Sequence, residues 1–362
     1  MKRLHAALTS RSYDVLVGRE CLDELGKALW SRAPGGQVVV CCDEHVAPLY
    51  LEQARDGLLA AGYAVSHVVV PAGERQKSLA RAEELYGVLY DRGVRRSDTL
   101  VALGGGVIGD LVGHVAATFQ RGVRLAQVPT TLLAQVDAAL GGKVAVDFRA
   151  GKNYVGTFYQ PWLVFADLKT LDTLPRRELL SGAAEVAKYA LLCGDEMLAR
   201  TERLAGTSLT AARVSQGLVA GCARCKLDVV AADEREETGQ RAALNLGHTI
   251  GHAIEAATGF RRFSHGEAVA LGLRAALWLS RRLCGLSAAD EARGLAVLDG
   301  LGLPQRLEGV AAEDIVELTR RDKKAGHEGV GYVLLDALGT PRLDVHVSPD
   351  LELEVSRWLT TP

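Results

Sequence analysis

The most constraining feature of the chain is a glycine-rich run, Gly104-Gly-Gly-Val-Ile-Gly-Asp110, between an apolar segment and a helical one. Residues 99–103 are apolar enough for a buried strand, and the residues up to about Phe119 have helical spacing. Glycines at G-x-G-x-x-G spacing let backbone N–H groups approach a pyrophosphate closely, so the run favours nucleotide binding over a plain tight turn. The Gly-x-x-x-x-Gly-Lys-Ser/Thr pattern does not occur, which argues against an NTPase.

Apolar and helical segments alternate through the first half of the chain. Apolar runs at 13–17, 37–42, 64–70, 124–128 and 163–167 predict strands, and the spacing at 48–61 and 78–92 predicts helices. This alternation is typical of an α/β unit with a parallel sheet. Asp43 and the charged turn 71–77 follow strand ends, and such sheets bind their ligands at that edge.

Polar residues interrupt apolar sequence between Pro129 and Asn153. Burial of such groups costs free energy unless they find partners, so they form either an internal network or the lining of a polar pocket. Lys143 and Lys152 stand beside glycines, which favours a pocket for an anion.

The pattern becomes largely helical, rich in alanine and leucine, from Glu178 to about Ser280. This change predicts a domain boundary near 174–177. Two amphipathic helices are expected at about 288–300 and 312–319, a basic cluster follows at 320–324, and a short strand is expected at 330–335.

Three of the nine histidines lie between Asn245 and Glu267. His248 and His252 are four positions apart, so they share one helix face, which Glu255 extends, and His265 follows a loop. This spacing suits a divalent metal such as zinc, although a helix with two histidines bonded to backbone is the alternative. Earlier in the chain, Glu185 and Lys188 share a helix face. Their apolar flanks favour a buried functional carboxylate over an exposed ion pair.

The composition excludes several functions. A formal charge of −2 gives no basic field for nucleic acid or an anionic membrane. The N-terminus lacks the apolar run of a signal peptide, and no stretch approaches the ~18 apolar residues of a membrane span, so a cytoplasmic protein is expected. The seven cysteines suit reduced thiols, and Cys222 and Cys225 fit helix packing better than a zinc or redox site.

Many specific strings follow one another along the chain: 104–110, Arg121-Gly-Val-Arg124, 128–137, Gly141-Gly-Lys143, Gly151-Lys-Asn153, 184–188, 245–252, His265-Gly-Glu267 and Asp322-Lys-Lys324. Together they resemble the 3-dehydroquinate synthase family, of the sugar phosphate cyclase superfamily, over nearly the whole length. The resemblance implies an N-terminal Rossmann-like, NAD-binding α/β domain (1–175) and a mainly α-helical, metal- and substrate-binding C-terminal domain (176–362). The active site is expected between them, in a homodimer.

The resemblance also implies the activity. It is conversion of 3-deoxy-D-arabino-heptulosonate 7-phosphate to 3-dehydroquinate and phosphate, in the shikimate pathway of aromatic amino acid biosynthesis. NAD acts catalytically beside a divalent metal, Zn²⁺ or Co²⁺. Three residues match the metal ligands of the family: Glu185, His248 and His265.

Two further sets of residues carry over from the family. The positions that match NAD contacts are Asp43, Glu74, Lys77, Gly106, Val107, Ile108, Gly109, Asp110, Thr130, Thr131, Lys143, Lys152, Thr170, Leu171, Asp172 and Thr173. The positions that match substrate contacts are Asp137, Lys143, Asn153, Lys188, Lys226, Arg241, Asn245, His252 and Lys324, with Arg121 reaching across a dimer.

The chain departs from the family pattern in a few places that flank the expected site. Val144 replaces a usual threonine, Phe148-Arg-Ala150 replaces a usual His/Thr-Pro-Leu, Ala190 replaces a common glycine, and one extra residue stands within 234–239, which shifts the alignment of Arg241. These changes bear on the identity of the substrate more than on the reaction type.

Three rival functions stay open from sequence. The nearest is an aminodehydroquinate synthase, or a related sugar phosphate cyclase, of a secondary-metabolite pathway; Asn245 and His252, which cyclases for other sugar phosphates typically alter, are both present. A non-catalytic regulator on the same fold should have lost a metal ligand or a catalytic lysine, and none is lost. An iron-dependent alcohol dehydrogenase should have a metal set richer in histidine.

Overall fold

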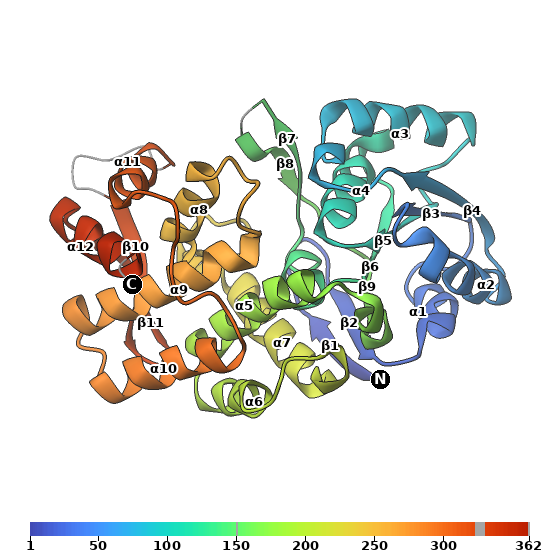
Figure 1. Cartoon of the computed structure of the whole chain (residues 1–362). Helices are drawn as coiled ribbons and strands as arrows, with labels where there is room; N and C mark the ends of the chain where they lie inside the picture. The colour runs from blue at the N-terminus through green and yellow to red at the C-terminus, as the bar shows by residue number, and fades with distance from the viewer. Residues whose placement is uncertain (150, 323–329, 361–362) are drawn as a thin grey trace. The chain divides into compact units, whose positions relative to one another are not determined.

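The computed structural model describes residues 1–149, 151–322 and 330–360, in two compact units (Figure 1). The first unit contains Met1–Leu174 and Ser215–Arg235, and the second contains Pro175–Val214 and Glu236–Pro362. The segment Ser215–Arg235 therefore returns to the first unit as helix α7 (Gln216–Ala232), which contacts β1, β2 and η5 of that unit. Because the chain enters the second unit and comes back, one sequence position does not divide the units.

The first unit is built on one twisted sheet with the strand order β1-β2-β9-β6-β5-β3-β4. All neighbouring strands are parallel except β1, which pairs antiparallel with β2 at the edge. The strands are β1 (Lys2–Ala6), β2 (Tyr13–Gly18), β3 (Gln37–Asp43), β4 (Ala64–Val70), β5 (Thr99–Gly104), β6 (Arg124–Pro129) and β9 (Leu163–Asp167). The strands expected in this half are confirmed, while β1 was missed because its polar sequence lacks an apolar run.

Helices and a hairpin complete the first unit. The α-helices are α1 (Leu25–Trp30), α2 (Glu52–Ala60), α3 (Leu79–Asp91), α4 (Gly106–Thr118) and α7. The short helical turns are η1 (Leu22–Glu24), η2 (Ala47–Leu51), η3 (Glu74–Gln76), η4 (Phe119–Arg121), η5 (Ala134–Ala138) and η6 (Leu168–Thr173). A separate antiparallel hairpin, β7 (Lys143–Phe148) and β8 (Gly151–Phe158), was not expected from sequence.

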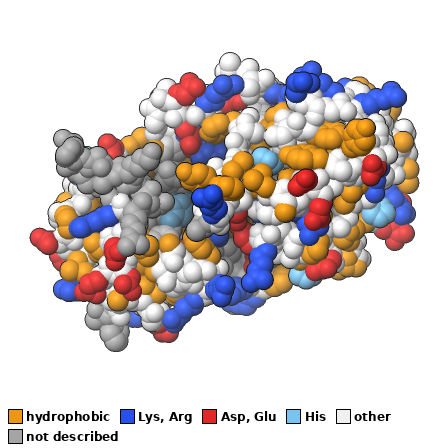
Figure 2. Space-filling view, turned by 90° about the horizontal axis from the view of Figure 1, so that it is seen from above, with side chains coloured by type: hydrophobic (Ala, Val, Ile, Leu, Met, Phe, Trp, Pro, Cys, Tyr) orange, Lys and Arg blue, Asp and Glu red, His pale blue; other side chains and the backbone are white. Residues whose placement is uncertain are grey.

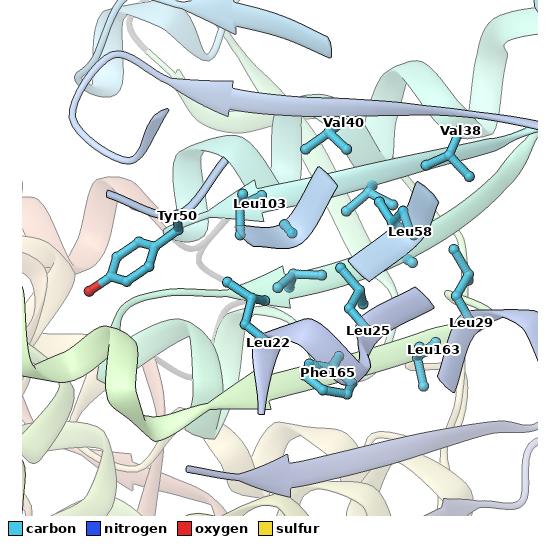
Figure 3. Packing of buried hydrophobic residues seen from close by; sticks show 14 of the residues in the cluster. Leu22, Leu25, Leu29, Val38, Val40, Tyr50, Leu58, Leu103, Leu163 and Phe165 are labelled. Carbon is cyan, nitrogen blue, oxygen red and sulfur yellow. The ribbon is translucent and has the colours of Figure 1, made fainter. Parts of the chain in front are cut away.

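Both faces of the large sheet are covered, which explains the continuous apolar runs of its strands. Side chains alternate between the two faces, so Val38 and Val40 pack in one core and Val39 in the other. Figure 3 shows the first core, where Leu25 of α1 and Leu58 of α2 pack over the strands. Helices α3 and α4 cover the opposite face.

The second unit is mainly helical. Its helices are α5 (Arg176–Leu192), α6 (Asp195–Ala205), η7 (Ala211–Arg213), η8 (Gln240–Asn245), α8 (His248–Ala257), α9 (His265–Leu283), α10 (Ala288–Gly300), α11 (Ala312–Asp322) and α12 (Pro349–Thr360). Strands β10 (Val330–Ala337) and β11 (Thr340–Val347) form a hairpin. The helices expected at about 288–300 and 312–319 and the strand at 330–335 are confirmed. The hairpin partner β11 and the final helix α12 were not foreseen.

The surface carries no single-sign field in the view of Figure 2, where basic and acidic side chains are interspersed. This agrees with the formal charge of −2. Among the described residues, no helix has both the length and the apolar character needed to cross a bilayer.

Two glycines let the central helices of the second unit approach at backbone distance. A Cβ on Gly266 of α9 would lie 2.2 Å from the carbonyl oxygen of Ser181 in α5, and a Cβ on Gly272 would lie 1.8 Å from the carbonyl oxygen of Gly247. The Gly266 N–H also donates to the Ser181 hydroxyl at 3.0 Å. Helix α9 therefore touches α5 at one point and the start of α8 at another.

We predict that Gly266→Ala lowers the free energy of unfolding by about 1–3 kcal/mol, because the added methyl group meets backbone that cannot rotate away. Gly87→Ala is the matched control: Gly87 lies within α3 and a Cβ there would meet nothing within 4 Å. That control should be stabilised by ~0.5–1 kcal/mol through loss of glycine's backbone freedom. Urea unfolding measures both, and equal behaviour of the two variants would contradict the close approach.

Candidate functional site

The carboxyl edge of the large sheet has the geometry of a nucleotide site. Strands β3, β4, β5, β6 and β9 follow the doubly wound order 2-1-3-4-5, in which the order reverses between β3 and β5. Ligands of such sheets bind outside the carboxyl ends of the strands at this reversal. Asp43 ends β3 there, and Gly104 ends β5.

The glycine run forms the start of helix α4. Its N-terminal N–H groups point out of the helix, and the positive end of the helix dipole favours an anion. A Cβ on Gly105 would lie 3.0 Å from Thr131 Cγ2, whereas one on Gly106 would meet only Ala138, at 3.6 Å. The helix start is thus bare backbone, as close approach of a pyrophosphate requires.

A buried ion pair adjoins this helix start. Lys77 Nζ lies 2.6 Å from Asp110 Oδ2, and Lys152 Nζ lies 3.9 Å from Glu74 Oε1. Burial raises the pKa of Asp110 against the opposing charge of Lys77. Burial lowers the pKa of Lys77, but the charges of Asp110 and Glu74 outweigh it and raise this pKa. Four residues predicted from sequence to contact NAD are therefore adjacent.

The β7–β8 hairpin carries Lys143, Lys152 and Asn153. Asp147 ties it to the charged turn: its backbone N–H donates to the Lys77 carbonyl at 2.8 Å, and its Oδ1 accepts the Asn153 N–H at 2.8 Å. Asn153 has a φ of 54°, in the left-handed region that asparagine adopts more readily than most residues.

Two of the departures from the family pattern, Val144 and Ala190, are packing positions. Val144 is buried against α4, where a Cβ on Gly113 would lie 2.3 Å from its Cγ1. Ala190 is fully buried in α5.

A second ion pair joins α7 to the π-helical turn η5. Lys226 Nζ lies 3.0 Å from Asp137 Oδ2 and donates to the Asp137 carbonyl at 2.8 Å. The contact explains why α7 belongs to the first unit although it lies far along the sequence.

The threonines of this unit are held by internal hydrogen bonds. The Thr130 N–H donates to the Gly104 carbonyl at 3.0 Å, and the Thr170 hydroxyl donates to the Asp167 carbonyl at 2.7 Å. Leu171 is buried, Asp172 pairs with Arg19 at 3.1 Å, and Thr173 bonds Tyr50.

Arg121 is not brought to this edge. It lies on η4, just before β6, and therefore at the amino edge of the sheet, opposite the glycine run. There it lines a hollow with Arg11, Arg96 and Arg124.

In the second unit, three helices bring Glu185, His248 and His265 together. Glu185 Oε1 lies 3.2 Å from His265 Nε2 and 3.5 Å from His248 Nε2. Glu185 is 1% exposed at its side chain, His248 12% and His265 34%. The cluster has the donor set of a divalent metal site.

The local sequence fixes the positions of the two histidines. Gly247, with a φ of 77°, is the residue before α8, so His248 is the first residue of that helix. Ser264 caps α9 in a capping box with Glu267, so His265 is the first residue of α9. The role of Glu267 is thus to hold the helix start.

The donor atoms fit zinc. Four ligands at about 2.0–2.1 Å in a tetrahedron are separated from one another by about 3.4 Å. The separations of Glu185 from His265 and from His248, 3.2 and 3.5 Å, bracket that value. Three protein ligands leave one position for substrate, as catalytic zinc sites do.

The charges in the cluster are strongly coupled. Burial lowers the pKa of His248 to about 3 although Glu185 opposes the shift. Burial also acts to lower the pKa of His265, but hydrogen bonds to Glu185 and Glu255 outweigh it and raise this pKa to about 10. A metal would require an unprotonated nitrogen from each histidine, so metal affinity at this cluster should depend on pH.

Lys188 completes the cluster. Its Nζ lies 2.6 Å from Glu185 Oε2, and both side chains are no more than 2% exposed. The buried, functional carboxylate expected from the apolar flanks is confirmed as buried. Such a pair contributes little net stability because both charges lose hydration, which favours a role in a site.

The other residues of this unit that the sequence predicted for the site differ in their exposure to solvent. His252 is exposed and its ring centroid lies 5.4 Å from that of His248. Arg241 is 2% exposed and Asn245 is exposed, both on η8. Lys324 lies outside the described residues. Sequence reasoning gave Glu255 no role, although it shares the helix face of the two histidines; in the structure it bonds His265 at 3.2 Å.

Comparison with known proteins gives two adjoining family matches. The model of the 3-dehydroquinate synthase N-terminal region matches residues 67–181, and that of its C-terminal region matches residues 182–325. The chain is 44% identical to 3-dehydroquinate synthase of Symbiobacterium thermophilum, covering 97% of this chain and 98% of the relative. It is 43% identical to 3-dehydroquinate synthase of Nitrobacter hamburgensis, covering 95% and 92%.

Solved structures of other sugar phosphate cyclases are also similar. The chain matches 2-deoxy-scyllo-inosose synthase complexed with carbaglucose-6-phosphate, NAD⁺ and Co²⁺ with a TM-score of 0.88, 27% identity and 99% coverage of both chains. It matches 2-epi-5-epi-valiolone synthase from Streptomyces hygroscopicus with NAD⁺ and Zn²⁺ bound with a TM-score of 0.84, 26% identity and 97% coverage of both chains. From the family matches and the near-complete relatives, the chain belongs to the 3-dehydroquinate synthase family.

Proposed function

We propose that the protein converts 3-deoxy-D-arabino-heptulosonate 7-phosphate to 3-dehydroquinate and phosphate, as an NAD- and metal-dependent lyase. The observation that carries the proposal is the meeting of Glu185, His248 and His265 from three helices, at separations that suit zinc. The similarity of the whole chain to 3-dehydroquinate synthases supports this reaction for the metal centre.

The reaction is redox-neutral overall. A transient oxidation acidifies the neighbouring C–H, phosphate leaves by elimination, and the oxidation is reversed. The ring then opens, and the resulting enol closes on the ketone in an aldol step. When bound, NAD supplies a reversible hydride acceptor, and Zn²⁺ or Co²⁺ supplies a Lewis acid for the substrate hydroxyls. Glu185, His248 and His265 would hold that metal.

The residues of the first unit hold the cofactor in this proposal. The start of α4, residues 106–110, faces the pyrophosphate, and Asp43 accepts hydrogen bonds from a ribose. Lys77 and Asp110 define the wall of the site through their 2.6 Å ion pair. The positions Glu74, Thr130, Thr131, Lys143, Lys152 and 170–173 complete the cofactor contacts.

Cationic and amide side chains bind the substrate anions. Lys143, Lys188, Lys226, Arg241 and Lys324 bind phosphate and carboxylate, and their fixed charges stabilise the enolate as it develops. Asp137 orients Lys226 through their 3.0 Å contact. Asn153 and Asn245 donate to substrate oxygens, and His252 faces the phosphate.

The same proposal covers assembly and location. Arg121 lies at the opposite sheet edge from the cofactor residues of its own chain, so we place it in the site of a second copy in a homodimer. The protein acts in the cytoplasm, with its cofactor domain near residues 1–175, to which 215–235 return, and its metal and substrate domain in the rest of 176–362.

We predict release of phosphate from the heptulosonate phosphate with NAD present far below the substrate concentration. Because the cofactor is regenerated in each cycle, many equivalents of phosphate should form per NAD. A chelator should abolish release, and Zn²⁺ or Co²⁺ should restore it. Phosphate measurement and NADH absorbance check this together.

Two results would contradict the proposal. Net accumulation of NADH would indicate a dehydrogenase, in which the cofactor is consumed stoichiometrically. Release from the aminated substrate but not from the hydroxy substrate would indicate an aminodehydroquinate synthase.

We predict that His252→Ala lowers kcat by at least about a hundredfold while the protein keeps its metal. His248→Ala is the matched control on the same helix face and should lose the metal itself. Elemental analysis and turnover distinguish the two variants. A metal-free His252→Ala protein would instead return both histidines to the ligand set.

A further inference from the structure

Glu255 is a buried carboxylate in an unfavourable place. It is 4% exposed and lies two residues before the end of α8 at Ala257. Burial of a carboxylate costs free energy unless it is paired, and the negative end of the helix dipole adds to that cost. Helix stability therefore does not explain an acidic residue at this position. We expect the side chain that pairs with Glu255 to explain it.

That partner is His265, which reaches Glu255 from the start of the next helix. Glu255 Oε2 lies 3.2 Å from His265 Nδ1, while His265 Nε2 lies 3.2 Å from Glu185 Oε1. The two ring nitrogens thus face two different carboxylates. A carboxylate can only accept, so either ring nitrogen can donate to the carboxylate that it faces, and a metal on Nε2 would leave the proton on Nδ1, toward Glu255.

His248 shows the same division of its ring nitrogens. Its Nδ1 lies 3.1 Å from the Leu246 carbonyl oxygen, and its Nε2 lies 3.5 Å from Glu185 Oε1. Both histidines therefore present Nε2 to Glu185 and Nδ1 to another oxygen. The acceptor is a backbone carbonyl for His248 and the Glu255 side chain for His265.

We propose that Glu255 is a positioning residue of the metal centre. Its carboxylate holds the Nδ1–H tautomer and the ring orientation of His265, so that Nε2 is available to the metal, and it makes that nitrogen a stronger donor. This inference rests on the proposed metal site formed by Glu185, His248 and His265.

Glu255 could also serve as a ligand itself, because His252, Glu255 and His265 have ligand atoms within 4.8 Å of one another. That arrangement would take His265 through Nδ1. The contacts favour the other set, since His265 Nε2 already lies at ligand spacing from Glu185 Oε1 and shares this oxygen with His248. The Glu255 variants distinguish a ligand role of this carboxylate from a role as the acceptor of the His265 Nδ1–H.

The test uses two variants of the full-length protein and one control. Glu255→Gln keeps an oxygen that can accept the Nδ1–H but removes the charge. Glu255→Met removes the acceptor and keeps most of the volume. Glu354→Gln, at an exposed position of α12, is the control. Zinc affinity is measured by chelator competition, and the visible spectrum of the cobalt-loaded protein reports ligand geometry.

We expect Glu255→Met to weaken zinc binding about 10- to 100-fold and to change the cobalt spectrum. Glu255→Gln should bind zinc with a loss below tenfold and keep the spectrum, and Glu354→Gln should match the parent. Rescue by glutamine separates positioning from packing, because both variants fill the site. Zinc affinity of Glu255→Met within twofold of the parent would overturn the proposal, as would equal loss in the glutamine and methionine variants.

The zinc-loaded protein gives a second readout should Glu255→Met fail to fold. The ¹⁵N-bound Nδ1 proton of His265 should persist in Glu255→Gln with a shifted resonance. An unchanged resonance, or a proton on Nε2 with the metal on Nδ1, would overturn the proposal.

These readouts need no turnover. A parent protein that binds no zinc would refute the proposed function, whereas a parent that binds zinc equally with and without the Glu255 carboxylate would refute only this inference.

Discussion

The burial of the Glu185 carboxylate is the constraint on which the second unit depends. At 1% exposure this charge needs partners, and they come from three places: Lys188 on its own helix, His248 at the start of α8 and His265 at the start of α9. One carboxylate and two imidazoles together offer an anionic oxygen and two nitrogens as donors to a divalent metal. The arrangement costs hydration, and a divalent metal offsets that cost while using the same atoms.

Helix contacts at backbone distance make this meeting of charges possible. Because Gly266 follows His265 directly, the contact with Ser181 holds the first turn of α9 against α5, one turn from Glu185. Gly272 and Gly247 make the corresponding contact with α8. The glycines in these motifs thus serve helix packing, while the histidines beside them lie next to Glu185.

The first unit reaches its site by a different route. Its strand order places Asp43 and the glycine run side by side at one sheet edge, although about sixty residues separate them in sequence. The β7–β8 hairpin then joins Lys152 and Asn153 to the charged turn through Asp147. The apolar runs predicted the strands, but the hairpin has mixed polarity and depends on contacts distant in sequence.

The sequence alone determined the elements and the chemical inventory. A strand that is buried on both faces of a sheet needs a continuous apolar run, and a capped helix needs particular residues at its ends. Most strands, helices and candidate ligands could therefore be identified from the sequence. The glycine run and the histidine spacing likewise indicated a nucleotide site and a metal site. These signals are local, since each lies within one element and its ends.

Only the tertiary structure decided which residues meet. Spacing alone put His248 beside His252, and the resemblance to the family named Glu185, His248 and His265 as a set. The approach of α5 and α9 is what brings the atoms of that set together. The return of α7 to the first unit depends on its packing there and on the Lys226–Asp137 contact. The spacing places Glu255 on the helix face of the two histidines, but its hydrogen-bond partner, His265, is ten residues further along the chain and beyond a loop. Side-chain partners across elements depend on packing geometry, which no local pattern records.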